Sequence, residues 1–467
     1  MNKMNLKYLA FFFVMLCCCE SYDSSGQTDT LRVMAYNVLD YGSYPLCQGS
    51  DGTYNTLLGT IVQFANPDII SLEKMGSIQM SPTDHNYTAA IGFQDSIVQF
   101  ALDASFPGRY NYCPNTNYAA GTYESSLFYD QQKLGFIAIT CTYTNTEDFN
   151  TYKLYYKDPN LATTHDTTYI YATLNHDISG SGSGSGALRG AQINGEMAAI
   201  QSHFTHLANM INMGDFNVRN TSEQVYDTLT APADTNFRYY DPPFHPDATF
   251  TTPADWDGDP TLFSAYLTTS ARSTAGTPNS CGVGGGAKDW YDHIFLSPWI
   301  INNANYISYI PHSYRTIGND GHRIGISVND PPTNTSVPSA VANALYQMSD
   351  KYPVMVDLLV TQNTTGTSPP DPEITPSAVI NQNITNEHAT ITNPAGDNII
   401  MHFSEGLVRQ PVLVECIDML GRTQIHETIT VDHETVQIPC NYLKTGVYYV
   451  RITGANGIIC QTKLVKN

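Results

Sequence analysis

The stretch Ile211-Asn212-Met213-Gly214-Asp215-Phe216-Asn217 constrains this chain more than any other feature of its sequence. It reads as a short strand that ends in a carboxylate, with an amide two residues further on. Alternate residues of an extended segment point to the same face, so Asp215 and Asn217 are expected to converge. Gly214 lets the backbone bend or be approached closely there. A carboxylate beside an amide suits a divalent cation or a phosphate held next to one, although an isolated Gly-Asp-x-Asn is also an ordinary turn sequence.

The length and charge of the chain limit what it can be. A chain of 467 residues is longer than one ordinary domain, and its hydrophobic fraction of 42% is enough for a core. Asp and Glu (43) outnumber Lys and Arg (22), and the net charge of −21 argues against a basic nucleic-acid footprint. A bound metal could still supply the positive charge that a phosphate needs.

Residues 1–21 have the pattern of a signal peptide. Lys3 and Lys7 precede a short apolar run, and three cysteines, residues 17–19, follow it. The run is too short for a membrane anchor, and a lipid-anchored cysteine is an alternative with a poor match. No later stretch is apolar enough to cross a membrane, so no transmembrane helix is expected in the mature chain. Export permits disulfides, but the later cysteines are odd in number and none shows zinc-ligand spacing. They are Cys47, Cys113, Cys141, Cys281, Cys416, Cys440 and Cys460.

Strand patterns with polar residues near their ends recur through the first part of the chain. The apolar spacing predicts strands over 31–39, 67–74, 126–129, 136–142, 168–176, 211–217, 289–296 and 347–358. It predicts helices over 53–65, 89–102 and 189–207. The Gly/Ser run Ser179–Gly186 is expected to form a flexible loop. Residues 363–380 are rich in Thr and Pro and are expected to link two domains.

The polar residues near these strand ends resemble, as a set, the site of one superfamily. They are Asn37, His176, Asp215 and Asn217 in Gly-Asp-Phe-Asn, Asp292 in Tyr-Asp-His-Ile-Phe, and Asp350 in Ser-Asp-Lys-Tyr-Pro-Val. This order resembles the endonuclease/exonuclease/phosphatase superfamily, which has the deoxyribonuclease I-like fold, over residues 28–362. The resemblance implies an α/β fold, a four-layer α-β-β-α sandwich of two packed sheets. It also implies hydrolysis of phosphoester bonds assisted by Mg²⁺ or Mn²⁺.

The resemblance assigns a role to each matching residue. It makes Asn37 an amide near the metal and the phosphate, and His176 the group that stabilises phosphoryl oxygens or protonates the leaving oxygen. Asp215 would orient or deprotonate the attacking water, while Asn217 would hold the phosphate. The remaining carboxylates are Asp292, an orienting group, and Asp350, a metal ligand and histidine partner. These parts suit an in-line attack, which needs a positioned water, an acid and positive charge on the phosphoryl oxygens.

Two positions depart from the superfamily pattern, and lysine occupies both. The superfamily places a metal-binding Glu where this chain has Lys74. The neighbouring Glu73, a candidate metal ligand beside Asn37 and Asp350, should point away from the site unless a bulge shifts it. The superfamily's final Ser-Asp-His is here Ser-Asp-Lys, ending in Lys351.

The two lysines change the charge expected at the site. An ammonium ~4 Å from a dication is repelled by about 8 kcal/mol at an effective dielectric of 20. Lys74 and a tightly bound Mg²⁺ therefore exclude each other unless the side chain turns out to solvent. Lys351 is a poor general base at its ordinary pKa of ~10.4. Either lysine could instead replace the metal and hold the phosphate as a point charge.

The last part of the chain, residues 381–467, has a different pattern. Short alternating segments between turn signals predict a small all-β sandwich. Its motifs, residues 417–422, 443–450 and 462–467, resemble the type IX secretion C-terminal sorting domain of Bacteroidetes-type bacteria. That resemblance implies the type IX machinery as a partner, with export to the outside of the cell or to its surface. A carbohydrate-binding appendage is the alternative, weakened by the lack of an obvious aromatic platform.

Three functions stay open at this point. The first is a secreted or surface metal-dependent phosphoesterase, of the nuclease or phosphodiesterase type, acting on a substrate such as extracellular nucleic acid. The second is a catalytically impaired binding protein of the same fold. The third is a phosphoesterase for small molecules or lipids. The low basic content argues against tight binding of duplex DNA.

Overall fold

The chain forms two compact units, Met1–Ile374 and Thr375–Asn467. In this computed structural model the described residues are 27–41, 51–76, 93–119, 121, 123–374, 389–392, 394–404, 407–418, 423–454 and 457–466. The predicted signal peptide lies outside them. No helix in the described part of the chain has the length and apolar character that crossing a bilayer requires.

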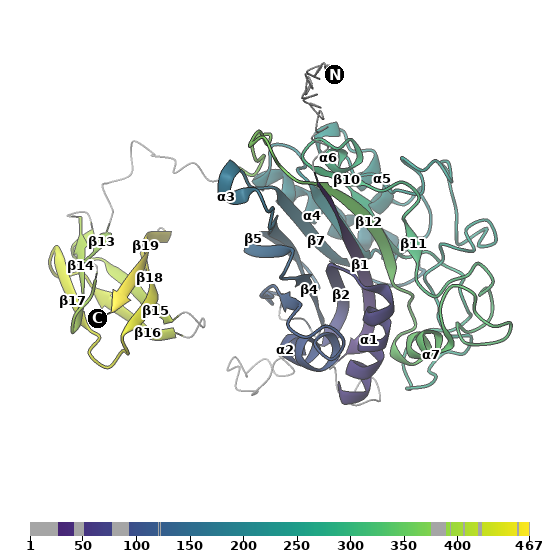
Figure 1. Ribbon diagram of the computed structural model, residues 1–467, viewed down its shortest axis with the longest axis horizontal. Helices are drawn as coiled ribbons and strands as arrows, with labels where there is room; N and C mark the ends of the chain where they lie inside the picture. Colours follow the sequence, from purple (N-terminus) through teal and green to yellow (C-terminus); the bar gives the residue numbers. More distant parts are fainter. Residues whose placement is uncertain are drawn as a thin grey trace, which may run out of the picture. The chain divides into compact units, whose positions relative to one another are not determined.

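The first unit contains a mixed sheet in which β1 is central. Its strand order is β10-β12-β1-β2-β4-β3, with β11 also paired to β12. The strands are β1 (Thr28–Tyr41), β2 (Ile69–Gly76), β3 (Tyr110–Tyr112), β4 (Tyr123–Asp130), β10 (Ile307–Tyr309), β11 (Arg315–Thr316) and β12 (Val354–Thr361). The pair β1 and β2 is parallel, whereas β12 runs antiparallel to β1. Figure 1 shows β12, β1 and β2 side by side.

A second sheet packs on the first through β7 and β8, which contact β1 and β2. Its strand order follows the sequence from β5 to β9. The strands are β5 (Leu134–Thr144), β6 (Asp148–Tyr156), β7 (Tyr169–His176), β8 (Met210–Asp215) and β9 (Asp292–Leu296). All six residues of β8 are buried, because both faces of this strand are covered.

Helices cover the outer faces of both sheets. The helix α1 (Asp51–Ala65) connects the parallel strands β1 and β2, and α4 (Ser183–His203) connects the parallel strands β7 and β8. A parallel pair needs such a crossover, and its helix packs back on the sheet. The other helical segments are α2 (Phe93–Ile97), η1 (Val98–Leu102), α3 (Leu161–Thr164), α5 (Gln224–Thr230), η2 (Thr235–Phe237), α6 (Pro298–Ile301) and α7 (Ser339–Met348). The predicted four-layer sandwich is therefore confirmed.

Two local predictions were wrong. The strand expected from residue 347 begins only at Val354, because α7 continues to Met348 and packs its apolar face against α1. The Gly/Ser run was expected to be loop throughout, but α4 begins inside it at Ser183. Tertiary packing overrides the low helix propensity of these glycines.

The sheet registers explain why distant polar residues meet. In the second sheet, His176 is paired with Asp215, and Asp215 with Asp292, so three polar residues stand in one row. In the first sheet, Asn37 is paired with Glu73. Because the two sheets pack face to face, the end of β1 meets the end of β8, where Asn37 bonds to Asp215.

Residues 363–374, predicted to belong to the linker, are held against the first unit. Lys153 forms ion pairs with Asp371 at 2.7 Å and Glu373 at 2.5 Å, and the Tyr171 hydroxyl donates to Asp371 at 2.8 Å. The Asn363 backbone N–H donates to Asp158 at 2.6 Å. We refer to residues 363–374 as the strap.

The second unit consists of two antiparallel sheets around a separate apolar core, as the predicted β-sandwich requires. One sheet has the order β13-β14-β17 and the other β16-β15-β18-β19. The strands are β13 (Ala389–Ile391), β14 (Asn398–Phe403), β15 (Pro411–Asp418), β16 (Thr423–Thr430), β17 (Thr435–Pro439), β18 (Gly446–Gly454) and β19 (Gly457–Lys466). The core includes Ile399, Val414 and Val450.

Candidate active site

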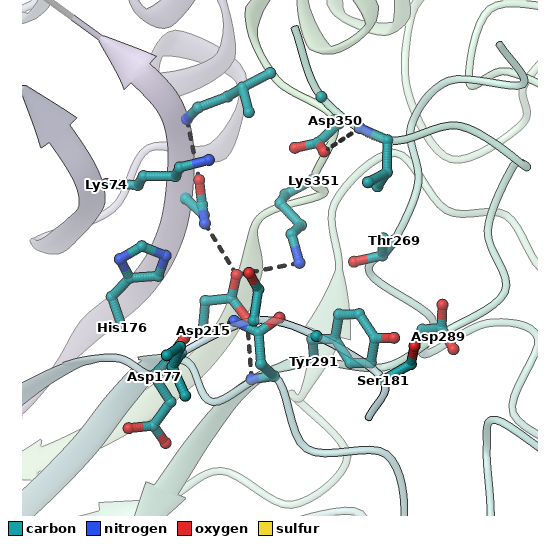
Figure 2. A pocket seen from close by; sticks show the side chains of 18 of the residues that line it. Lys74, His176, Asp177, Ser181, Asp215, Thr269, Asp289, Tyr291, Asp350 and Lys351 are labelled. Atoms are coloured by element: carbon teal, nitrogen blue, oxygen red, sulfur yellow. Dashed lines mark hydrogen bonds and ion pairs between the residues drawn. The ribbon is translucent and has the colours of Figure 1, made fainter. Parts of the chain in front are cut away.

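A cavity of about 800 Å³ lies at the strand ends of the first unit. Seven of the residues predicted from the sequence line it: Asn37, Lys74, His176, Asp215, Asn217, Asp350 and Lys351. Glu73 and Asp292 do not line it. Figure 2 shows the labelled side chains of Lys74 and His176 on one side of Asp215, with Lys351 on the other.

Asp215 is the centre of the site. One carboxylate oxygen, Oδ2, accepts a hydrogen bond from Asn37 Nδ2 at 2.9 Å and lies 3.1 Å from Lys351 Nζ. The other, Oδ1, accepts from the Asn217 backbone N–H at 3.1 Å. Burial alone would raise the pKa of Asp215, but the charges of Lys351 and His176 outweigh it and hold that pKa below its usual range. Asp215 is therefore a buried anion that accepts hydrogen bonds.

The backbone before Asp215 requires glycine. Gly214 has a φ of +140°, and a Cβ at this position would lie 2.0 Å from the carbonyl oxygen of Asn175. The two parallel strands β7 and β8 can approach this closely only because residue 214 has no side chain. This approach places His176 beside Asp215.

Lys351 is almost fully buried among acidic groups. Burial alone would lower its pKa, but attraction to Asp215, Asp292 and Asp350 outweighs it and raises the pKa above the usual lysine range. Its Nζ also lies 4.6 Å from the centre of the Tyr291 ring, a cation–π distance. Lys351 is thus a fixed cation and cannot serve as a general base near neutral pH.

His176 is paired with Glu147, a residue that the sequence reasoning missed. The distance from His176 Nδ1 to Glu147 Oε1 is 2.5 Å. Burial alone would lower the pKa of His176, but the Glu147 carboxylate outweighs it and raises that pKa. With Nδ1 engaged by Glu147, Nε2 is the ring nitrogen left for a ligand in the cavity. Glu147 lies in the turn between β5 and β6, where no strand-end pattern marks it.

Lys74, the residue where the motif resemblance predicts a Glu, lines the cavity. Its Nζ lies 3.4 Å from Asp40 Oδ1 and 5.5 Å from the centre of the Tyr123 ring. The pairing of β2 with β4 shifts between Leu72 and Met75, and Lys74 itself has a φ of +58°. This irregularity aims the lysine side chain into the cavity.

Glu73 and Asp292 are fully buried beside the cavity, each with 0% exposure. Glu73 accepts a hydrogen bond from Ser71. Burial, together with repulsion from Asp292 and Asp215, raises the pKa of Glu73 well above its usual range. Burial and the Asp215 charge likewise raise the pKa of Asp292. Burial therefore disfavours the charged form of both carboxyl groups.

Asp350 is held from the side opposite Asp215. Its Oδ2 accepts a hydrogen bond from the Val283 backbone N–H at 2.7 Å. The glycine before Val283 leaves room, since a Cβ on Gly282 would lie 2.9 Å from the Asp350 Cβ. The loop that carries these residues also contains Cys281, which forms a disulfide, whereas Cys113, Cys141 and Cys440 are free.

The residues of the site do not fit Mg²⁺ or Mn²⁺. Within the described residues, no three side chains of His, Cys, Asp or Glu converge as a metal-binding group. Among the predicted ligands, Asn37 donates from Nδ2 to Asp215, and its Oδ1 accepts from the Leu39 backbone N–H at 3.0 Å. Glu73, another predicted ligand, does not line the cavity. The cation beside Asp215 is the Lys351 ammonium. The site is therefore built around lysine and histidine charges.

Fold and site together define an α/β sandwich of the deoxyribonuclease I-like class with a polar cavity at its strand ends. Residues 392–467 match the family model described as the secretion system C-terminal sorting domain, which confirms the predicted sorting domain and points to export. None of the curated proteins matches the chain.

Solved structures similar to this chain carry names of the class that the motifs resemble. Truncated TDP2 of Caenorhabditis elegans is 13% identical, covers 71% of this chain and 98% of its own, and has a TM-score of 0.40. ANGEL2, named a 2′,3′-cyclic phosphatase, is 11% identical, with coverages of 72% and 99% and a TM-score of 0.40. An endonuclease/exonuclease/phosphatase family protein of Leptotrichia buccalis is 11% identical, with coverages of 70% and 98% and a TM-score of 0.38. At such identities and scores, the function has to be argued from the site itself.

Proposed function

We propose that this protein is an exported phosphoesterase, of the phosphodiesterase type, that holds its phosphoryl group with lysine and histidine charges. The observation that carries the proposal is the 3.1 Å ion pair between Lys351 and Asp215, in the same cavity as His176 and Lys74. The sequence-based expectation of Mg²⁺ or Mn²⁺ gives way to these cations, because the donor set does not suit a divalent ion.

Each group has one task in this proposal. Lys74 and Lys351 balance the negative charge on the phosphoryl oxygens as point charges. Asp215 accepts a hydrogen bond from the attacking water and orients it, since its low pKa makes it a weak base. Water adds its oxygen to phosphorus while the ester P–O bond breaks, and His176 gives its proton to the departing oxygen. The proton of the attacking water passes to solvent, from which His176 regains its own. Glu147 acts through His176 as a positioning residue.

Hydrolysis of bis(4-nitrophenyl) phosphate by the purified full chain tests the proposal. We expect turnover in the presence of a chelator, and a loss of about 10²–10⁴-fold in His176→Ala, the range for a missing general acid. His312→Ala, a mostly exposed histidine, is the matched control and should keep full activity. Turnover only with added Mg²⁺ or Mn²⁺ would contradict the proposal.

A second candidate is a phosphoester-binding protein of this fold without turnover. The observation that favours it is the same ion pair, because Lys351 neutralises the carboxylate that should orient the water. Binding without hydrolysis in the wild-type chain, joined with metal-dependent turnover in Lys74→Glu with Lys351→His, would establish this second function.

A further inference from the structure

A second polar region of the same cavity lies beyond Lys351. Thr269 forms isolated antiparallel bridges with both Lys351 and Asp289. Residues directly opposite each other in an antiparallel pair point their side chains to the same face, with Cβ atoms about 5 Å apart. Lys351, Thr269 and Asp289 therefore form one row, and all three line the cavity. Figure 2 shows Thr269 lying between Lys351 and Asp289.

The Thr269 hydroxyl is poised for a ligand. The residue is 2% exposed, and within the described part of the chain its Oγ1 has no hydrogen-bond partner. In Figure 2 this hydroxyl is directed toward the space beside Lys351. A buried hydroxyl left without a partner is unfavourable, so an occupant that hydrogen-bonds it gains affinity.

Asp289 adds acceptors to the same wall. It is buried, and the nearby Asp257 carries an ion pair to Arg219 at 3.2 Å. Burial and the hydrogen bond with Asp257 raise the pKa of Asp289 to about 6. This pair of carboxyl groups repels a second phosphate but can accept hydrogen bonds from neutral hydroxyl groups.

The aromatic ring in this region is not free for stacking. Tyr291 has Lys351 at 4.6 Å and Arg219 at 5.6 Å from its ring centre. A nucleobase that stacked on this ring would have to displace a cation. The region therefore suits hydroxyl groups better than a flat aromatic base.

We infer that Thr269 and Asp289 form a subsite for the vicinal hydroxyls of a sugar or polyol joined to the phosphate held beside Lys351. The inference rests on the proposed function and narrows its substrate class to phosphoesters with free hydroxyls. The hydroxyl group of Thr269 donates to one ligand oxygen, and the Asp289 carboxylate accepts from a neighbouring hydroxyl.

Binding of three probes to the full chain, measured by calorimetry in the presence of a chelator, tests the inference. They are ribose 5-phosphate, 2-deoxyribose 5-phosphate and inorganic phosphate. We expect the ribose ester to bind about tenfold more tightly than the deoxyribose ester, the effect of one well-placed hydrogen bond. Thr269→Val and Asp289→Asn should each remove this preference, and both variants should still bind inorganic phosphate.

Asp259→Asn is the matched control, because Asp259 is an exposed carboxylate of the same region that does not line the cavity. It should keep the tenfold preference. Equal binding of both sugar phosphates to the wild-type chain would overturn the subsite while leaving phosphate binding intact. Failure of all three probes to bind, inorganic phosphate included, would instead overturn the proposed function and the subsite with it. If both variants still bind ribose 5-phosphate more tightly than 2-deoxyribose 5-phosphate, other residues distinguish the two sugars and the proposed subsite is wrong.

Discussion

Lys351 Nζ lies 3.1 Å from Asp215 Oδ2, at the point where the last strand of the first sheet meets the second sheet. The pair sets the charge of the whole site. It fixes a cation inside a protein whose net charge is −21, and it keeps Asp215 ionised despite its burial. A phosphoryl group that enters the cavity therefore meets positive charge beside a carboxylate that can hold water.

The first prediction concerns the removal of this cation. Lys351→Met leaves the buried Asp215 carboxylate uncompensated, which should destabilise the first unit by about 3–5 kcal/mol. Urea denaturation at pH 7 measures this. The pKa of Asp215 is lowered in the folded state. The ionised Asp215 therefore stabilises the fold at pH values above the ordinary pKa of Asp, and this stabilisation is lost as the pH falls through the pKa of Asp215 in the folded protein. The destabilisation should therefore shrink in acid, and an equal loss at all pH values would contradict the assignment.

The second prediction concerns the histidine and its partner. The raised pKa of His176 means that its contribution to stability is present below the ordinary histidine pKa of ~6.5 and is lost as the pH rises through the folded value. Glu147→Gln removes the carboxylate that contributes most to raising this pKa, so the pKa of His176 should fall. NMR titration of the His176 ring measures the shift, and the alkaline limb of the pH–rate profile, which a general acid controls, should move to lower pH with it. Glu427→Gln, on an exposed strand of the second unit, should change neither.

The third prediction concerns the glycine before Asp215. Gly214→Ala should destabilise the first unit by about 3 kcal/mol or more, or prevent its folding, because backbone strain and overpacking each cost about 1–3 kcal/mol. A Cβ would meet the Asn175 carbonyl oxygen at 2.0 Å, and the φ of +140° is unfavourable for any side chain. Thermal unfolding measures the change. Gly108→Ala is the matched control, since that glycine also has a positive φ but no atom within 4 Å of the added Cβ, and its effect should be much smaller.

The fourth prediction separates the strap from the sorting domain. A chain that ends after Ile374 keeps the ion pairs of Lys153 with Asp371 and Glu373, so its first unit should unfold at the temperature of the full chain. A chain that ends after Gln362 loses them and should unfold several degrees lower. Equal unfolding temperatures would show that the strap does not stabilise the first unit.

Both truncated chains lack the sorting domain and should remain in the periplasm in a fractionation experiment. Their delivery to the cell surface would refute the role of the sorting domain in export.

The sequence predicted site residues that lie on or directly beside strands with a clear pattern, and it missed Glu147 and Thr269, which no such pattern marks. Asp215 and Asn217 follow an uninterrupted apolar strand, and His176 ends another, so alternation and strand order were enough to bring them to one place. Asp292 was also correctly placed on a strand, yet its side chain lies beneath the cavity, because no sequence pattern gives the depth of a polar group between two packed sheets. Glu147 and Thr269 lie in a turn and a long loop, where only tertiary contacts reveal a role.

In the proposed function, lysine and histidine hold the phosphoryl group in place of a metal ion. Calorimetric titration of the full chain with inorganic phosphate in excess chelator tests it most directly, with Lys74→Ala and Lys351→Met beside the wild type. We expect saturable binding in the wild type that weakens about tenfold or more in each variant, the effect of one lost charge-assisted contact. This binding should also weaken as the pH rises through the His176 pKa. Binding that is absent until Mg²⁺ or Mn²⁺ is added, and that both variants retain, would contradict it.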